Sequence, residues 1–150
     1  MGQQLACELT QLLVGARDGL LALLESDVDA PRGDGAWTKR QILGHLIDST
    51  AANHQRFVRA QFTDELRFPP YDAPGWVVVE RYEVANWPLL VDLFVAYASF
   101  LAHVLSVMPD DQLATPCWVD WYGDPQPIPL SQVASEYLDH VRRHLGQLTG

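Results

Sequence analysis

Cysteine is scarce in this chain of 150 residues, which contains only Cys7 and Cys117. Disulfide frameworks and thiolate zinc sites need several cysteines at short, regular spacing. Two cysteines so far apart in the sequence provide neither. The chain is therefore not a disulfide-stapled fold, and a metal site would have to use other ligands.

Basic residues are also few: 10 lysines and arginines stand against 19 acidic residues, and the net charge is -9. Surfaces that bind nucleic acid are built from clustered lysine and arginine side chains. Here the basic residues occur in scattered pairs, such as Lys39–Arg40 and Arg142–Arg143. We therefore expect no nucleic-acid partner.

Long apolar runs are missing as well, since no stretch approaches the roughly 20 apolar residues that span a bilayer. The first twenty residues lack a basic leader followed by an uninterrupted apolar stretch, so no signal peptide is indicated. We expect a cytoplasmic protein with no membrane partner.

The residues that are present suit a packed globular domain. Hydrophobic residues make up 48% of the chain and aromatic residues 10%, which supports a buried core and argues against disorder. A chain of this length forms one domain of ordinary size. We expect a single domain that spans residues 1–150.

Four segments repeat apolar residues at steps of three and four, the pattern of amphipathic helices. Thr38 and Gln41 form a capping box at the start of the second segment, and Asn86 and Ser131 are the expected N-caps of the third and fourth. Pro88 is tolerated in the first turn of the third. The predicted helices cover residues 3–26, 38–62, 86–108 and 131–148.

The segments between these helices are unequal in length. Residues 63–85 and 109–129 are longer connections than an up-down-up-down bundle needs. The first has room for a short helix at Trp76–Tyr82, and the alternating run Cys117–Tyr122 is compatible with a small hairpin. We predict an all-α fold: a four-helix bundle with long connections between helices two and three and between helices three and four.

The five histidines differ in their prospects as metal ligands. His140 and His144 lie four positions apart, so both imidazoles share one face of a helix. His45, in a segment whose apolar density indicates burial, is the best third donor, and three imidazoles would leave a coordination position open. His54 should face the opposite side of its helix, and His103 should lie on a helix surface. The alternative for the pair is two partly exposed histidines near a helix C-terminus.

Polar residues near these histidines could serve the same site. Asp48 lies one turn after His45 and Glu136 one turn before His140, so either could orient an imidazole; Glu136 could also be a metal ligand or a general base. Solvated acids on a helix flank are an equal alternative. Arg56 lies about 16 Å along the helix from His45. It could bind the far end of a cofactor or substrate, or form a structural ion pair.

Two runs in the sequence resemble a known family. Residues 37–49, WTKRQILGHLIDS, and residues 137–147, YLDHVRRHLGQ, are similar to the two signatures of the DinB-like (DinB/YfiT-like) superfamily. The resemblance extends from about residue 37 to residue 148. It includes further residues between the runs: Asn53, Arg56, Phe68, Tyr71, Trp76, Tyr82, Trp87 and Pro109.

The resemblance implies a four-helix bundle in which His45, His140 and His144 bind a divalent metal, usually nickel or zinc, and often a homodimer. Relatives include transferases and isomerases that use mycothiol, bacillithiol or glutathione, and others are described as metal-dependent hydrolases. We therefore expect a metal-dependent enzyme that activates a low-molecular-weight thiol or water toward a small substrate. The alternative is a bundle that binds a metal or a small ligand without catalysis.

Overall fold

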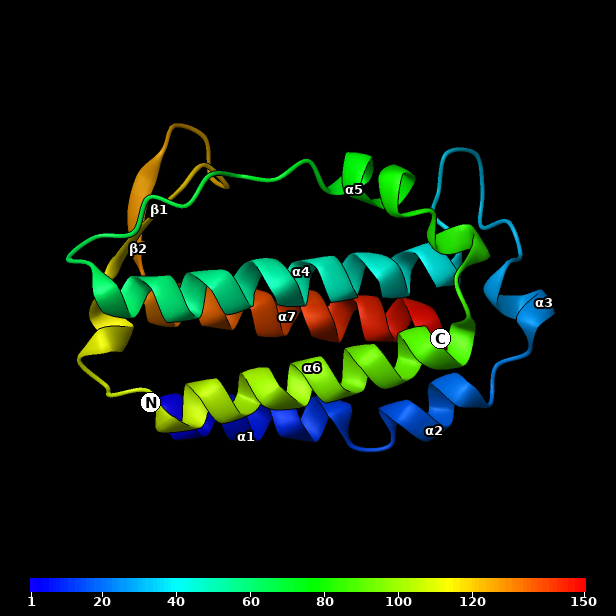
Figure 1. Cartoon of the computed structure of the whole chain (residues 1–150), viewed down its shortest axis with the longest axis horizontal. Coiled ribbons are helices and arrows are strands. Elements are labelled where there is room, and N and C mark those ends of the chain that lie inside the picture. The colour runs from blue at the N-terminus through cyan, green and yellow to red at the C-terminus, as the bar shows by residue number, and fades with distance from the viewer.

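Four long helical stretches form the bundle in the computed structural model, which describes all 150 residues (Figure 1). α4 lies beside α7, while α1 and α6 form the other side of the bundle. A small two-stranded sheet is the only departure from the predicted all-α fold. The stretches are α1 (Gly2–Leu13) with α2 (Ala16–Leu21), α4 (Lys39–Arg59), α6 (Trp87–Val107) and α7 (Leu130–Thr149).

The first predicted helix, over residues 3–26, is wrong as a single element. The chain leaves the helix at Val14, Gly15 adopts a left-handed conformation with φ 74°, and α2 follows. A left-handed backbone is easily reached only by glycine. A separate short helix, α3 (Glu25–Val28), comes after α2. The apolar stripe nevertheless continues across the break, because Leu13 and Leu20 are both buried.

The predicted starts of α4 and α6 are confirmed. The Thr38 hydroxyl accepts the backbone N–H of Gln41, and the Gln41 side chain accepts the backbone N–H of Thr38. At α6, the Asn86 side chain accepts the N–H of Leu89 at 2.9 Å, with Pro88 in the first turn. These side chains satisfy backbone donors that have no partner inside the helix.

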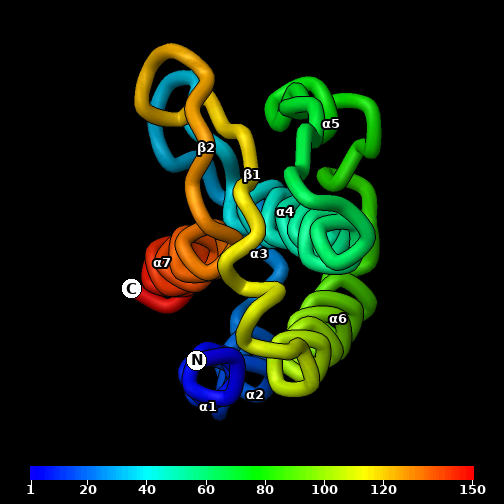
Figure 2. The backbone as a smooth tube through the Cα atoms, turned by 90° about the vertical axis from the view of Figure 1, so that its left-hand side faces the viewer, coloured from blue at the N-terminus to red at the C-terminus, as the bar shows by residue number.

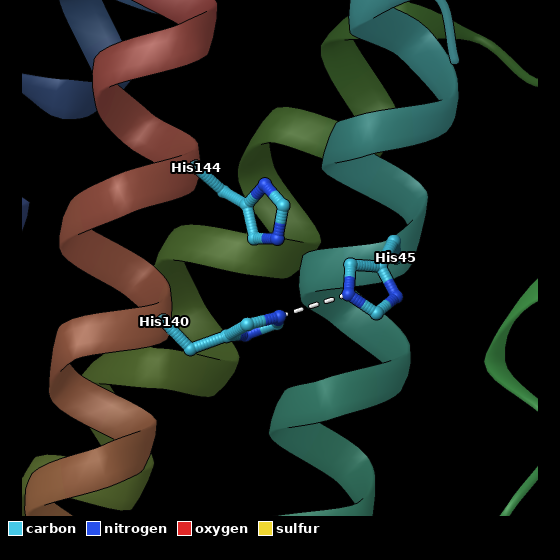
Figure 3. Close-up of side chains that lie close together, drawn as sticks. All are labelled: His45, His140 and His144. Carbon is cyan, nitrogen blue, oxygen red and sulfur yellow. Dashed lines mark hydrogen bonds between the residues drawn. The ribbon is translucent and has the colours of Figure 1, made fainter. Parts of the chain in front are cut away.

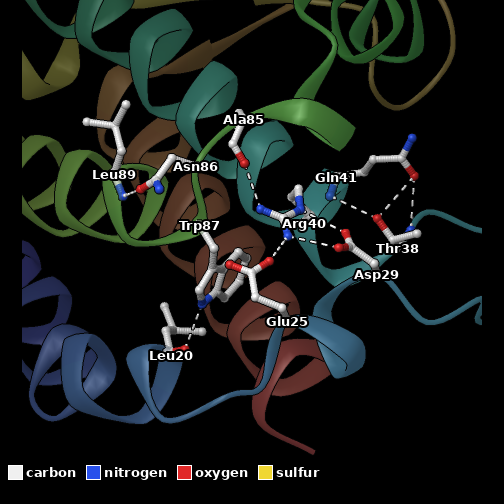
Figure 4. A network of polar contacts seen from close by, with 10 residues as sticks. All are labelled: Leu20, Glu25, Asp29, Thr38, Arg40, Gln41, Ala85, Asn86, Trp87 and Leu89. Atoms are coloured by element: carbon white, nitrogen blue, oxygen red, sulfur yellow. Dashed lines mark hydrogen bonds and ion pairs between the residues drawn. The ribbon is translucent and has the colours of Figure 1, made fainter.

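Arg40 ties three parts of the chain together at the beginning of α4 (Figure 4). Its buried guanidinium donates to Asp29 Oδ1 at 2.8 Å and to the Ala85 carbonyl at 2.6 Å, and it also pairs with Glu25. These contacts hold α3 and the start of α6 against α4. The orientation of α4 is thereby fixed one turn before the first histidine of interest.

A hairpin leads directly into α7. Strand β1 (Pro116–Val119) pairs antiparallel with β2 (Gln126–Pro129), and α7 begins at Leu130 without a side-chain cap. The prediction that Ser131 caps this helix is wrong. The Leu130 N–H instead donates to the Thr115 carbonyl at 2.9 Å, so the hairpin supplies a partner for an end of the helix.

The connection from α4 to α6 contains a 3-10 turn (Ala60–Phe62), then α5 (Ala73–Glu80), and a second 3-10 turn (Tyr82–Val84). The short helix expected at Trp76–Tyr82 is present but begins three residues earlier, with the Asp72 side chain as its N-cap. Figures 1 and 2 place α5 and the hairpin on the same side of the bundle, above α4 and α7 and away from α1 and α6.

α6 is more apolar than the sequence analysis indicated. Its 21 residues are long and apolar enough to cross a membrane by length and composition, so the expectation that no segment approaches this limit is wrong. In the structure one face of α6 packs against α1 and α4. Its buried residues are Trp87, Leu90, Val91, Phe94, Ala98, Leu101, Ala102 and Leu105.

Candidate metal centre

Three imidazoles from two helices point toward one another (Figure 3). His45 comes from α4, and His140 and His144 come from successive turns of α7. One ring nitrogen from each lies within 4.8 Å of the others, and Nε2 of His45 is 2.9 Å from Nε2 of His140. The adjacent helices α4 and α7 thus bring together the three histidines that the sequence analysis selected.

The outer nitrogens of the α7 pair have hydrogen-bond partners. His144 Nδ1 is 2.6 Å from Oε1 of Gln147, and His140 Nδ1 is 3.2 Å from the Ser49 hydroxyl. An amide oxygen only accepts, so His144 carries its proton on Nδ1 and keeps a lone pair on Nε2. The same arrangement holds for His140 when the Ser49 hydroxyl accepts.

The environment keeps these rings neutral. Burial, followed by the neighbouring His144 and Arg143, lowers the pKa of His45 to about 4. Burial and the other two imidazoles lower the pKa of His140 to about 3. Burial likewise lowers the pKa of His144. At neutral pH the imidazole lone pairs therefore remain available to bind a metal cation.

The donor set fits a divalent transition metal. Two neutral nitrogens 2.9 Å apart repel each other unless a proton or a cation lies between them. Metal–imidazole bonds of about 2.0–2.1 Å place two nitrogens on the same ion at most about 4.2 Å apart. A contraction of less than about 1 Å would bring the whole cluster within that limit.

Asp48 is buried beside this cluster but does not contact it. The hydroxyl of Tyr82 donates to Asp48 Oδ1 at 2.6 Å, whereas Oδ2 has no partner. The other buried side-chain atom without a partner is Nδ1 of His45, one turn earlier on the same helix. Burial, followed by the Glu80 carboxyl, raises the pKa of Asp48 to about 7. The predicted contact between Asp48 and an imidazole is not formed in this structure.

Gly44 explains how Tyr82 reaches Asp48. A Cβ atom at position 44 would lie 2.2 Å from Cδ2 of Tyr82, so only glycine lets the aromatic ring approach α4 this closely. The sequence analysis assigned no role to Tyr82. The available signal was a glycine in the middle of an otherwise strong helix, which indicates close packing by a neighbour.

A cavity of about 590 Å³ opens beside His140, between α4 and α7. Tyr71 of the first long connection and Trp121 and Tyr122 of the hairpin turn help to cover it. Glu136 lines this cavity too, but its carboxylate accepts from the Tyr122 hydroxyl and has no hydrogen bond to His140. The remaining lining residues are Ser49, Asn53, Arg56, Tyr137, Asp139 and Arg143.

Arg56 lies in the wall of the same cavity. Its side chain is buried, and no carboxylate lies within ion-pair distance, so the structural ion pair considered from the sequence is wrong. The guanidinium carbon is 5.3 Å from the centroid of the Phe68 ring and 5.6 Å from that of Trp121. One weak hydrogen bond, 3.4 Å long, joins it to the Asn53 side chain.

The other two histidines lie outside the cluster, as predicted. A ring nitrogen of His54 is 2.7 Å from the Tyr97 hydroxyl, on the side of α4 that faces α6. His103 is exposed on α6, where its ring stacks on that of Phe100. Neither residue is near enough to join the three-histidine group.

Comparisons with known proteins find similar sequences. The family profile of the DinB superfamily matches residues 12–148. A Bacillus subtilis (strain 168) protein named "Putative metal-dependent hydrolase YfiT" is 35% identical over 128 residues, which are 85% of this chain and 70% of that protein. A Bacillus pumilus (strain SAFR-032) protein named "Putative metal-dependent hydrolase" is 25% identical over 129 residues, 85% of this chain and 71% of its own length.

A solved structure has the same fold. The structure of YfiT from Bacillus subtilis, described as "a probable metal-dependent hydrolase with an unusual four-helix bundle topology", superposes with a TM-score of 0.81. The alignment covers 99% of this chain and 85% of that structure at 21% identity. This likeness confirms the predicted four-helix bundle.

Proposed function

Because the chain belongs to the DinB superfamily, we propose that it is a metal-dependent enzyme that activates a nucleophile toward a small substrate. The nucleophile is water in a hydrolase or a low-molecular-weight thiol in a transferase. The single observation that carries the proposal is the convergence of three neutral imidazoles, one of which, His140, lines a cavity large enough for a small molecule. The names of the relatives favour hydrolysis.

His45, His140 and His144 would hold the metal, for which nickel and zinc both suit imidazole donors. A divalent ion in such a site supplies Lewis acidity and lowers the pKa of water or of a thiol in its open position. Gln147 holds His144 in the tautomer that ligation needs, and Ser49 does the same for His140 when its hydroxyl accepts.

Two acids have separate proposed roles. Asp48 would orient His45, because the unpaired Oδ2 of the acid and the unpaired Nδ1 of the imidazole lie one helical turn apart. Glu136 would accept the proton that the nucleophile releases, since its carboxylate lines the cavity that also reaches His140. Its bond to Tyr122 holds it in place.

The molecular setting of this activity is also proposed. We expect a homodimer in the cytoplasm, acting on a freely diffusing small molecule. The support for a dimer is a stripe of exposed, mostly apolar residues on α6. They are Leu89, Leu93, Ala96, Phe100, His103 and Val107. The alternative function is a non-catalytic bundle in which the metal joins α4 to α7 or holds a small ligand.

Elemental analysis of protein purified without a nickel column tests the metal site. The wild type should retain about one divalent ion per chain, and His144→Ala should lose it. His54→Ala is the matched control, because His54 is also a hydrogen-bonded helix histidine but lies outside the cluster. A fully folded, metal-free wild type would contradict the proposal.

Two substrate panels then separate the reactions. Esters and amides without added thiol test hydrolysis, and a chloroarene with a series of small thiols tests transfer. Turnover that needs the thiol identifies a transferase, whereas turnover without it identifies a hydrolase. Metal-loaded protein that is silent in both panels would favour the binding alternative.

A further inference from the structure

Arg56 is a buried cation without an anionic partner in this chain. Its exposed fraction is 9%, and its only hydrogen bond is the 3.4 Å contact to Asn53 Oδ1. A guanidinium carries five N–H donors and stays protonated in proteins. Burying such a charge is unfavourable unless a counter-ion or a full set of hydrogen bonds compensates. The chain itself supplies neither.

The unused donors of Arg56 face open space. Only two side-chain atoms are both inaccessible to solvent and without a hydrogen-bond partner, His45 Nδ1 and Asp48 Oδ2. The nitrogens of Arg56 that make no hydrogen bond are therefore accessible. Arg56 and Trp121 line both the cavity beside His140 and an adjoining cavity of about 300 Å³. A small molecule in either cavity can therefore reach the guanidinium.

The acids that share these cavities are not placed to neutralise Arg56. Glu136 accepts from Tyr122, and Asp139 is paired with Arg142. Asp120 lines the smaller cavity, but its side chain is exposed and makes no ion pair with Arg56. The charge of Arg56 is thus left for a ligand.

We propose that Arg56 and Asn53 bind a carboxylate at the far end of the molecule whose reactive end lies at the three imidazoles. This inference rests on the proposed function for the position of the reactive end. Ser49 contacts His140, and Arg56 follows Ser49 by seven residues on α4, so the carboxylate lies about 10 Å along the helix from the Ser49 side of His140. Guanidinium binds a carboxylate through two parallel hydrogen bonds, which accounts for an arginine at this position.

The faces of Phe68 and Trp121 complete this subsite. The guanidinium carbon lies over both rings, and these contacts stabilise the cation. Because both belong to the two long connections, the carboxylate subsite is formed where these connections meet α4. The predicted substrate is an acid long enough to reach from His140 to Arg56, and an uncharged analogue should bind less tightly.

Calorimetric titration of the metal-loaded protein with paired probes tests the proposal. Octanedioic acid monohydroxamate has a metal-binding head and a distal carboxylate, and its methyl ester lacks only the charge. The acid should bind the wild type about 10- to 100-fold more tightly than the ester. In Arg56→Met this preference should disappear through weaker binding of the acid, while affinity for the ester stays the same.

Arg56→Lys provides a second variant, which should keep the charge but reduce the preference for the acid. The four-carbon homologue, butanedioic acid monohydroxamate, is too short to span the site and should show little preference in any protein. An acid-to-ester ratio that is the same in the wild type and in Arg56→Met would overturn the proposal.

Failure of the metal site gives a different result. If no metal is retained, both hydroxamates bind poorly, but hexanoate should still bind the wild type more tightly than hexanamide does, and Arg56→Met should remove the difference. Equal binding of hexanoate and hexanamide to the wild type would refute the carboxylate subsite independently of the metal.

The carboxylate can belong either to an acyl substrate or to a thiol. 8-Sulfanyloctanoate and its methyl ester repeat the comparison with a thiol head group. An Arg56-dependent preference for both acids supports the subsite, and a preference confined to one head group assigns the carboxylate to that class of molecule.

Discussion

At the scale of single residues, the three imidazoles differ in the hydrogen-bond partner of the ring nitrogen that faces away from the cluster. His140 and His144 have partners on their outer nitrogens, whereas Nδ1 of His45 is buried without one. Ligating histidines commonly donate this outer N–H to a carboxylate or a carbonyl oxygen. Asp48 is the carboxylate nearest to His45 in the sequence, and one of its oxygens is unpaired. Loss of this carboxylate should weaken metal binding mainly by removing the partner of His45.

Asp48→Asn should weaken metal binding by about 10- to 100-fold, because an amide is a poorer acceptor for the imidazole N–H. Competition with a chromophoric chelator measures the affinity. Glu136→Gln is the control, since Glu136 bonds to Tyr122 and to no imidazole. Equal affinities of the wild type and Asp48→Asn would remove Asp48 from the site.

The same substitution should stabilise the metal-free protein at alkaline pH. Burial raises the pKa of Asp48 to about 7, whereas the unfolded chain has an ordinary aspartate with a value near 3.8. The folded state therefore holds the proton between these values, and the free energy of unfolding falls as pH rises from about 4 to about 7. Above pH 7 the buried charge is unfavourable, and Asp48→Asn should raise the free energy of unfolding by about 1 to 3 kcal/mol.

Urea unfolding of the chelator-treated proteins at pH 5 and pH 8 checks this linkage. The stability difference between Asp48→Asn and the wild type should be larger at pH 8. A difference that is independent of pH, or larger at pH 5, would show that Asp48 ionises normally in the folded protein.

The sequence predicted the histidine cluster because helical spacing and apolar flanks carry the necessary information. His140 and His144 follow from the four-residue step, and His45 from the density of apolar residues around it. The sequence did not predict that Arg56 lacks an ion pair, because this depends on which side chains the long connections place near it. That information lies in tertiary structure and not in local spacing.

At the scale of elements, α4 is positioned from both sides before it presents His45. Arg40 fixes its first turn through Asp29 and Ala85, and Tyr82 packs on Gly44 in the next. A side chain at position 44 would move the connection between α4 and α6 away from the helix. This packing is therefore expected to control both stability and the setting of Asp48.

The substitution of alanine for two helix glycines tests this packing. Gly44→Ala should destabilise the protein by about 1 to 3 kcal/mol, because its Cβ would overlap the Tyr82 ring. Gly146→Ala in α7 meets no neighbouring atom and should stabilise it by about 0.5 to 1 kcal/mol. Thermal unfolding of both variants gives the comparison. Equal effects would show that Tyr82 does not pack closely on α4.

Helix patterns predicted the existence of the long elements better than their ends. The capping box at Thr38 and the cap at Asn86 are local, so they could be recognised directly. The break at Gly15 was missed because the apolar stripe continues through it. The sequence wrongly indicates Ser131 as the cap of α7. The hydrogen bond from the Leu130 N–H to the Thr115 carbonyl joins residues 15 positions apart, so local sequence does not reveal it.

At the scale of the whole molecule, α6 is apolar on its packed face and largely apolar on a second, exposed face. One face packs in the bundle, and the other is exposed along its length. The exposed positions alternate in steps of four and three, the spacing of a helix that packs against another helix. They are Leu89, Leu93, Ala96, Phe100, His103 and Val107.

This stripe predicts a homodimer in which α6 packs against its counterpart. Phe100→Lys should convert the dimer to a monomer, because a buried, unpaired ammonium is strongly unfavourable at such an interface. Light scattering measures the mass, and metal content should not change. Val79→Lys, at an exposed apolar residue on α5, is the control. A monomeric wild type, or a dimeric Phe100→Lys variant, would contradict this assignment.

The cavity combines walls from the helices with a cover from the connections. Its end beside His140 is formed by α4 and α7, whereas Tyr71, Trp121 and Tyr122 come from segments outside the bundle. Insertions or replacements in those segments would alter which molecules are accepted without disturbing the imidazoles. Homologous proteins can therefore retain the same chemistry while evolving toward different substrates.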